Sequence, residues 1–187
     1  MTGVGLMVFN RLKRPNRPST KSPRQRREGA AAVEFALLAI PFFGLLLAIF
    51  EVAIILTVSA ILEAAVMNSG RMVRTGQIPP DATVEDFRRE ICDRMAIFSS
   101  ACYKRIQIDV QPIASFTNPG VTNPIKDGVF DPNKTKVDIG QARSLMLMRV
   151  WYSQPVVSPF LGHAMTKLGN GDTLLHATTA FRNEPYT

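Results

Sequence analysis

The chain has 187 residues, of which 46% are hydrophobic, so it can form one modest domain and one membrane-spanning element but not two large globular units. Its formal net charge of +7 is confined to residues 1–28, which hold eight of the 22 basic side chains and one of the 15 acidic ones. Phe9 is the only aromatic residue in that segment, which is therefore typical of a membrane-surface anchor, and nucleic acid is not an expected partner.

Residues 1–28 are rich in Arg, Lys, Pro and Ser and have almost no apolar periodicity. A segment of this composition cannot bury enough apolar surface to fold, so we expect it to be disordered. The positive-inside rule places the basic flank of a membrane helix in the cytoplasm. The sequence therefore predicts a basic cytoplasmic leader over residues 1–29.

One long helix is predicted from Ala30 to about Thr75. It is apolar on every side as far as Phe50, which is a length that suits a bilayer, and it becomes amphipathic after Glu51. We therefore expect residues 30–76 to form a transmembrane helix that continues beyond the bilayer as a stalk.

One carboxylate, that of Glu34, lies near the start of this apolar run. A charged side chain at the centre of a membrane helix costs about 2.5–3.5 kcal/mol, and less near the interface, so an acid at this position needs a partner. Cleavage after Gly29 would create an amine on Ala30, one helical turn from the Glu34 side chain. The pattern indicates a helix whose newly formed amino terminus neutralises its own buried acid.

Gly29, Glu34 and Phe35, at the junction of a basic leader and a membrane-length apolar run, resemble the processing site of type IV prepilins in the variant of the tight-adherence (Tad) pilus. The sequence is most similar to the TadE-like minor pseudopilins. Further similarity lies in two cysteines and three short motifs: Cys92 and Cys102, Asn118-Pro119-Gly120, Phe130-Asp131-Pro132 and Phe181-Arg182-Asn183-Glu184-Pro185-Tyr186.

This resemblance implies that a prepilin peptidase cuts between Gly29 and Ala30 and that the product takes part in Tad pilus assembly as a substrate, not as an enzyme. The implied partners are that peptidase, other minor pilins, Tad pilus assembly proteins and membrane lipid. The implied location is the inner membrane, crossed once, with residues 77–187 in the periplasm or outside the cell. The shaft pilin of such systems has almost no domain after its helix, so a large domain favours an initiating, tip or assembly role.

The part of the chain after the stalk is predicted to be a small α+β domain with a short helix and an antiparallel sheet, a pilin-like fold class. A capping signal at Thr83 and Asp86 predicts a helix over residues 84–97. Alternating apolar and polar residues predict a half-buried strand over residues 104–110, with Asp109 on its polar face. The other predicted segments are strands over residues 144–152 and 174–182, an irregular surface loop over residues 112–140 and a helical turn over residues 158–168.

Cys92 and Cys102 lie ten positions apart in the predicted exported domain, where thiols oxidise. A disulfide between them would stabilise the domain by about 2–3 kcal/mol and would tie the end of the second helix to the first strand. Two unconnected buried thiols are the alternative. Because no histidine is nearby and the spacing is not Cys-x-x-Cys, a metal or redox site is less expected than a disulfide.

No catalytic, cofactor or metal site is expected. His163 and His176 have no carboxylate or cysteine neighbours at ligand spacing, and the chain has no Gly-x-Ser-x-Gly turn or glycine-rich phosphate loop. The main alternative function is an uncleaved signal anchor that carries a periplasmic binding or enzyme module. Calcium is a further hypothesis for the loop over residues 112–140, although its oxygen-bearing side chains lack the spacing of an EF-hand: Asp127, Asp131, Asn133 and Asp138.

Overall fold

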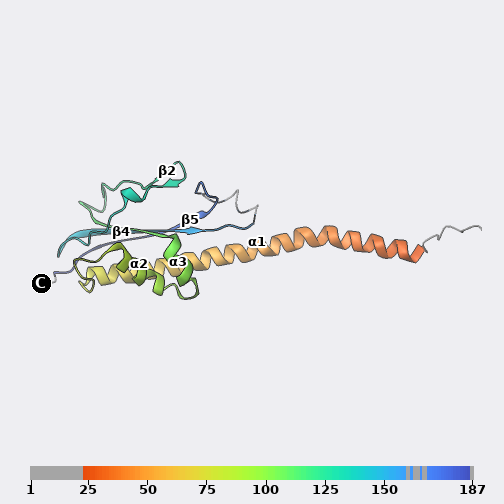
Figure 1. Cartoon of the computed structure of the whole chain (residues 1–187), viewed down its shortest axis with the longest axis horizontal. Coiled ribbons are helices and arrows are strands. Elements are labelled where there is room, and N and C mark those ends of the chain that lie inside the picture. Colours follow the sequence, from red (N-terminus) through yellow and green to blue (C-terminus); the bar gives the residue numbers. More distant parts are fainter. Residues whose placement is uncertain (1–22, 159–160, 162–164, 166–167, 186–187) are drawn as a thin grey trace, which may run out of the picture. The chain divides into compact units, whose positions relative to one another are not determined.

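The computed structural model describes residues 23–158, 161, 165 and 168–185, so His163 and residues 1–22 of the predicted leader lie outside the described residues (Figure 1). The chain divides into two units, residues 1–43 and 44–187, and helix α1 (Pro23–Arg74) contributes to both. The remaining elements belong to the second unit: α2 (Val84–Asp93), η1 (Ala96–Phe98), α3 (Ser99–Arg105), β1 (Ile106–Pro112), β2 (Ile125–Lys126), β3 (Val129–Phe130), η2 (Pro132–Lys134), β4 (Leu145–Gln154) and β5 (Thr173–Arg182).

Helix α1 begins at Pro23, so the predicted start at Ala30 and the predicted disorder of the residues just before it are wrong. Proline suits the first turn of a helix because its missing N–H group would have no partner there. The Arg, Gln and Glu residues that follow have high helix propensity. The helix continues through Pro41 and ends at Arg74, close to the predicted end at Thr75.

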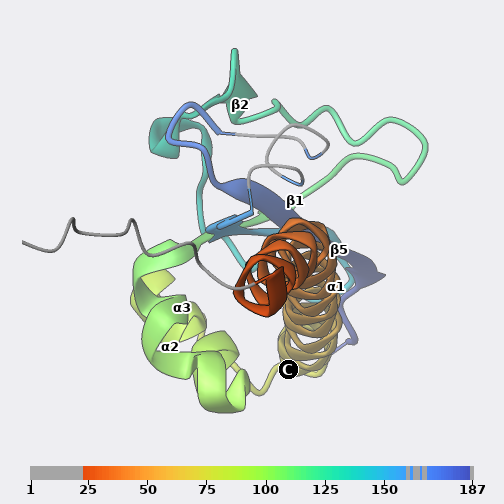
Figure 2. The same ribbon diagram turned by 90° about the vertical axis from the view of Figure 1, so that its right-hand side faces the viewer.

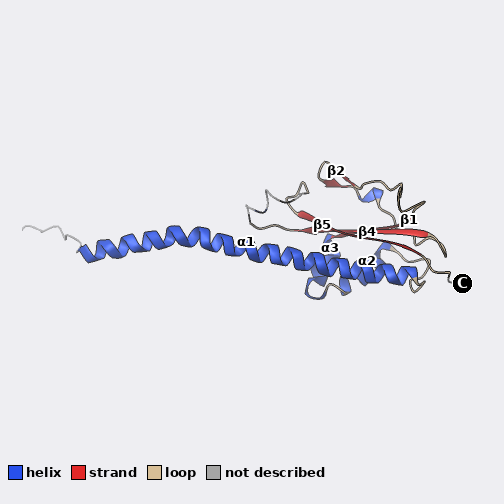
Figure 3. Cartoon of the chain, turned by 180° about the vertical axis from the view of Figure 1, so that it is seen from behind, coloured by secondary structure: helices blue, strands red, loops and turns tan. Residues whose placement is uncertain are grey.

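The fold class is α+β, as predicted, with an antiparallel sheet in the strand order β1-β4-β5. Within the second unit, α2, α3 and the second half of α1 lie on one face of this sheet, and the segment that contains β2, β3 and η2 lies on the other (Figure 1 and Figure 2). Figure 3 shows the same layers from behind. The sheet is therefore covered on both faces, by the α-helices on one and by the segment around β2 and β3 on the other.

The main core lies between the helices and the sheet. Helix α1 contributes a stripe of buried side chains at helical spacing: Ile55, Val58, Leu62, Ala65, Val66 and Val73. The central strand β4 contributes alternate residues from its helix-facing side: Met146, Met148, Val150 and Tyr152. Burial of this stripe ties the second half of α1 to the sheet by the hydrophobic effect.

Gly70 allows α1 to approach β5 closely. A Cβ atom at this position would lie 2.8 Å from Cγ2 of Thr179 and 3.2 Å from the ring of Phe181. After β5, the N–H of Glu184 donates to the carbonyl oxygen of Arg74 at 2.9 Å, and the two side chains form an ion pair. The carboxyl-terminal segment thus closes over the last turn of α1.

Cys92 and Cys102 form a disulfide, as predicted, with their Cα atoms 5.5 Å apart. The bridge joins α2 to α3 and not to the first strand, so that part of the prediction is wrong. A continuous helix would separate two residues ten positions apart by about 15 Å, which no disulfide can span. The predicted helix over residues 84–97 accordingly ends at Asp93, and Ala96 takes a φ of 50° as the chain reverses.

Asp109 is fully buried, so its predicted place on an open polar face is wrong. Strand pairing puts Asp109 opposite Arg149, whose Nη2 donates to Oδ2 of Asp109 at 2.7 Å. The same Nη2 donates to the carbonyl oxygen of Thr122 at 3.0 Å, and the N–H of Lys136 donates to Oδ1 of Asp109 at 3.0 Å. This ion pair therefore holds the segment over residues 112–140, which includes the β2–β3 hairpin, against the sheet.

We expect Asp109→Ala to lower the free energy of unfolding by about 3–5 kcal/mol, because Arg149 would keep a largely buried charge without its partner. Urea unfolding of the full chain in detergent, followed by the fluorescence of Trp151, the only tryptophan, measures this loss. The matched control is Lys134→Ala, which removes an exposed ion pair with Asp131 and should cost no more than about 1 kcal/mol. Equal losses in the two variants would contradict a structural role for the buried pair.

Candidate functional site

The residues predicted to form the processing site lie together on the part of α1 that belongs to the first unit. Ala30 and Glu34 are four positions apart and so share one face of the helix. Gly29, Ala30, Glu34 and Phe35 are all exposed, Phe35 by 72%. A Cβ atom at Gly29 would meet no heavy atom within 4 Å, so the described part of the fold does not require glycine there.

The peptide bond between Gly29 and Ala30 lies inside a helix, because α1 begins at Pro23. The backbone groups of a helix are engaged in hydrogen bonds, so a peptidase could reach this bond only after local opening. Glycine is about 0.8–1.0 kcal/mol less favourable than alanine in a helix interior. Gly29 therefore makes this turn of α1 easier to open than the alanine-rich turn that follows.

The helix surface around these residues is apolar and uncovered. Large hydrophobic side chains project on all sides of the helix, each exposed by more than half: Val33, Phe35, Leu37, Leu38, Ile40, Phe42, Phe43, Leu45, Leu47, Ile49 and Phe50. In the described part of the chain, one helical stretch, residues 29–74, is long and apolar enough to cross a membrane. Apolar surface of this extent marks a site of membrane or protein contact, so α1 is a candidate membrane anchor.

Two acids in the apolar half of α1 have different surroundings. Within the described residues, Glu34 forms no hydrogen bond or ion pair. Glu51 accepts hydrogen bonds from the N–H groups of Val157 and Ser158, the second at 2.9 Å. Sequence reasoning missed the Glu51 contact because its partners are 106 and 107 positions away. The carboxylate of Glu34 is thus available for a partner, whereas that of Glu51 already has two.

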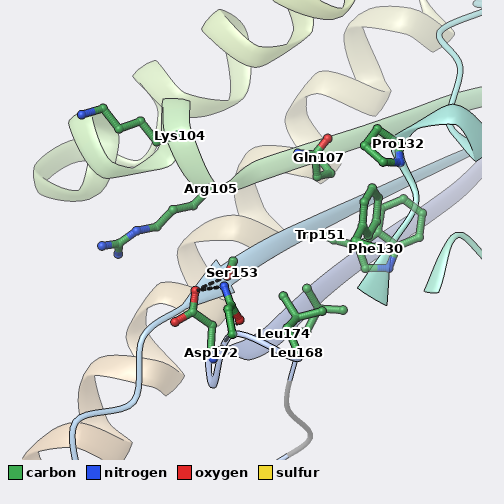
Figure 4. Close-up of a pocket in the computed structure, with 11 residues that line it drawn as sticks. Lys104, Arg105, Gln107, Phe130, Pro132, Trp151, Ser153, Leu168, Asp172 and Leu174 are labelled. Carbon is green, nitrogen blue, oxygen red and sulfur yellow. Dashed lines mark hydrogen bonds between the residues drawn. The ribbon is translucent and has the colours of Figure 1, made fainter. Parts of the chain in front are cut away.

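The second unit has a cavity of about 280 Å³ beside β4 (Figure 4). Trp151, which is buried in its wall, packs edge-to-face against Phe130 with ring centroids 5.4 Å apart. The described lining residues are basic, polar, aromatic and aliphatic: Lys104, Arg105, Gln107, Phe130, Pro132, Trp151, Ser153, Leu168, Asn170, Asp172 and Leu174. This mixture of residue types does not indicate a particular class of ligand.

The polar groups of this cavity bond to one another. The hydroxyl of Ser153 donates to Oδ2 of Asp172 at 2.5 Å, and the side-chain amide of Asn170 donates to the same oxygen at 3.0 Å (Figure 4). A nucleophilic serine needs an adjacent base, and the described lining residues include no histidine. The carboxylate of Asp172 thus binds the hydroxyl of Ser153 and the amide of Asn170 together.

Two of the acidic side chains that were considered as calcium ligands accept hydrogen bonds within their own turns. Oδ1 of Asp131 accepts from the N–H of Asn133 at 3.1 Å, and Oδ1 of Asp138 accepts from the N–H of Gly140 at 2.9 Å. Asp127 lies in the β2–β3 turn with a φ of 53°. The described residues contain no group of three or more His, Cys, Asp or Glu side chains placed to hold a metal ion.

The family comparison bears on the same stretch of α1 as the candidate processing site. Residues 29–71 match the family model of TadE-like proteins. The match begins at Gly29, covers α1 almost to its end and confirms the TadE-like resemblance for this part of the chain. The match to this family suggests the general context of Tad pilus systems. No curated protein and no solved structure matched the chain.

Proposed function

We propose that this chain is a TadE-like minor pseudopilin that takes part in Tad pilus assembly, and that it is a substrate of a prepilin peptidase and not an enzyme. The observation that supports this most directly is the family match, which begins at Gly29 and follows the apolar helix. The exposed Glu34, four residues after Ala30, adds a chemical reason for cleavage at that point. The proposed processing site comprises Gly29, Ala30, Glu34 and Phe35.

The proposed topology rests on charge and on the disulfide. The basic residues 1–28 would stay in the cytoplasm, α1 would cross the inner membrane once, and residues 77–187 would lie in the periplasm or outside the cell. Disulfides persist in such oxidising compartments and are rare in the cytoplasm. The bridge between Cys92 and Cys102 therefore supports export of the domain.

Cleavage would change the electrostatics of the helix start. It would leave an ammonium group on Ala30, where the positive end of the helix dipole disfavours a cation, with Glu34 one turn away. In a low-dielectric environment, the two opposite charges would each lower the cost of burying the other. Glu34 would bind either its own Ala30 amine or that of a neighbouring subunit, which would set the axial position of helices in an assembly.

The proposed partners follow from the two exposed parts of the molecule. The apolar surface of α1 up to Phe50 would contact lipid before assembly and helices of other minor pilins afterwards. The α+β domain would contact Tad pilus assembly proteins. Because this domain is too large for a shaft subunit of such systems, the proposal assigns the chain an initiating, tip or assembly role.

An uncleaved signal-anchored periplasmic module is the second candidate. The continuation of α1 across Gly29 fits an intact anchor, and the cavity beside Trp151 fits a small ligand. The state of the amino terminus separates the two candidates.

We expect Gly29→Leu to leave the precursor uncut, because a bulky side chain would occupy a position that accepts a small residue. Mass spectrometry of the membrane-associated protein should find Ala30 at the amino terminus of the unsubstituted chain and an intact leader in the variant. The matched control is Gly44→Leu on the same helix, which also meets no heavy atom within 4 Å and should be cut normally. An intact leader on the unsubstituted mature protein would favour the uncleaved module.

We expect Glu34→Gln to be cut and inserted normally but to fail in pilus assembly. Loss of the carboxylate would leave the Ala30 ammonium group buried without a partner, a defect of roughly 3–5 kcal/mol in a dry site. Electron microscopy of pili, with immunoblotting of the protein, measures the effect. Glu63→Gln, which changes an exposed acid farther along α1, is the matched control and should assemble. Normal piliation by Glu34→Gln at normal protein level would contradict the pairing.

A further inference from the structure

The segment that follows β4 is bonded to α1 through one side chain. Glu51 accepts the N–H groups of Val157 and Ser158 on its two carboxylate oxygens. Val156 packs against the main core, so the segment is held from a second side. Val157 is nonetheless 88% exposed. A hydrophobic side chain is therefore presented outward by a backbone that is fixed at two points.

The position of Glu51 along α1 determines where this segment lies relative to the bilayer. Residues 30–50, which are apolar except for Glu34, would measure about 31 Å as a helix, close to the roughly 30 Å of a bilayer's hydrocarbon core. If α1 spans the membrane, as the proposed function requires, Glu51 lies where the helix leaves the hydrocarbon. The backbone that Glu51 binds then lies at the outer interface.

The chemistry of the segment suits that interface. The sequence from Val150 to Thr166 contains no Asp, Glu, Lys or Arg. Backbone N–H groups that approach lipid need an internal acceptor, and Glu51 supplies one for Val157 and one for Ser158. Phe50, 65% exposed, continues the apolar surface of the helix into the turn that carries Glu51.

We infer that residues 155–158 form a membrane-contact segment, in which Val157 enters the outer interfacial layer of the bilayer and Glu51 fixes its depth. The partner is the lipid surface of the bilayer that α1 crosses. The domain then has two points of contact with the membrane, the helix and this segment. Two contacts limit the swing of the domain about α1 and present its other surfaces to assembly partners in a fixed orientation.

The test places an environment-sensitive NBD fluorophore on a cysteine introduced at position 157 of the full chain, with the native disulfide intact. The chain is reconstituted alone into vesicles of phosphatidylcholine and phosphatidylglycerol. We expect the Val157→Cys label to emit at shorter wavelength than in water, to be quenched by spin labels on the lipid and to be shielded from aqueous iodide. The matched control is the Val129→Cys label on β3, a site exposed by 63%, which should behave as in water.

The role of Glu51 is tested in the same labelled chain. Glu51→Ala removes both acceptors, so the label at position 157 should lose most of its wavelength shift and of its quenching by lipid spin labels. Glu63→Ala, which changes an exposed acid farther along α1, should leave both signals unchanged. A Glu51→Ala variant with an unchanged signal would overturn the role of this residue in setting the depth.

A label at Leu38→Cys separates failure of this inference from failure of the proposed function. Leu38 lies in the apolar run, 72% exposed, and its label should be quenched by lipid spin labels if α1 crosses the bilayer. Quenching at position 38 without quenching at position 157 overturns the inference and leaves the anchor intact. Absence of lipid quenching at both positions overturns the proposal that α1 is a membrane anchor. Shielding of position 157 from iodide without lipid quenching indicates contact with a second copy of the chain, which also overturns the inference.

Discussion

The structure depends on one constraint, which is that a single helix must face two environments. From Phe35 to Phe50, α1 is apolar on all sides, and most of its large side chains are exposed. From Ile55 onward the buried residues narrow to a stripe, which the sheet and the short helices cover. The change of pattern near Glu51 therefore decides where protein packing begins. Without the sheet, the stripe from Ile55 to Val73 would be exposed as well, so the position of the domain follows from the need to cover it.

On the face of the sheet that points away from the helices, the charge of Arg149 must be neutralised. β4 carries Arg149 and Trp151 there, and a charge beside a large aromatic ring is stable in a partly dry environment only when its partners are in place. Asp109 supplies the opposite charge from the neighbouring strand, and Thr122 supplies a carbonyl oxygen from the covering segment. An otherwise irregular stretch of chain is thereby held on the sheet by these polar contacts together with the packing of Phe130 on Trp151. The helix side is held mainly by apolar packing.

The two acids in the apolar half of α1 show how the same residue type can serve different purposes. Glu51 is satisfied within the chain by two backbone amides, so it acts as a structural link. Glu34 has no partner among the described residues, and its location in an apolar surface makes such a state costly. Cleavage before Ala30 would create an amine that could pair with this acid. In the proposed pilin chemistry, a single hydrolysis would both remove the leader from the helix and create the ammonium group on Ala30 that pairs with Glu34.

Local sequence determined the features that depend on neighbouring residues: the long apolar helix, the strands near residues 144–152 and 174–182, and the grouping of Ala30 with Glu34 on one helix face. The disulfide partners could also be predicted, since the chain has only two cysteines. Only the tertiary structure decided that Asp109 is buried, that the bridge ends in α3, and that Glu51 binds the backbone at Val157. Each of these depends on which distant segment covers a given surface, as with Thr122 over Arg149. Alternation and helical spacing identify which side of an element is apolar, but they carry no information about what covers its polar side, because those contacts join residues far apart in the chain.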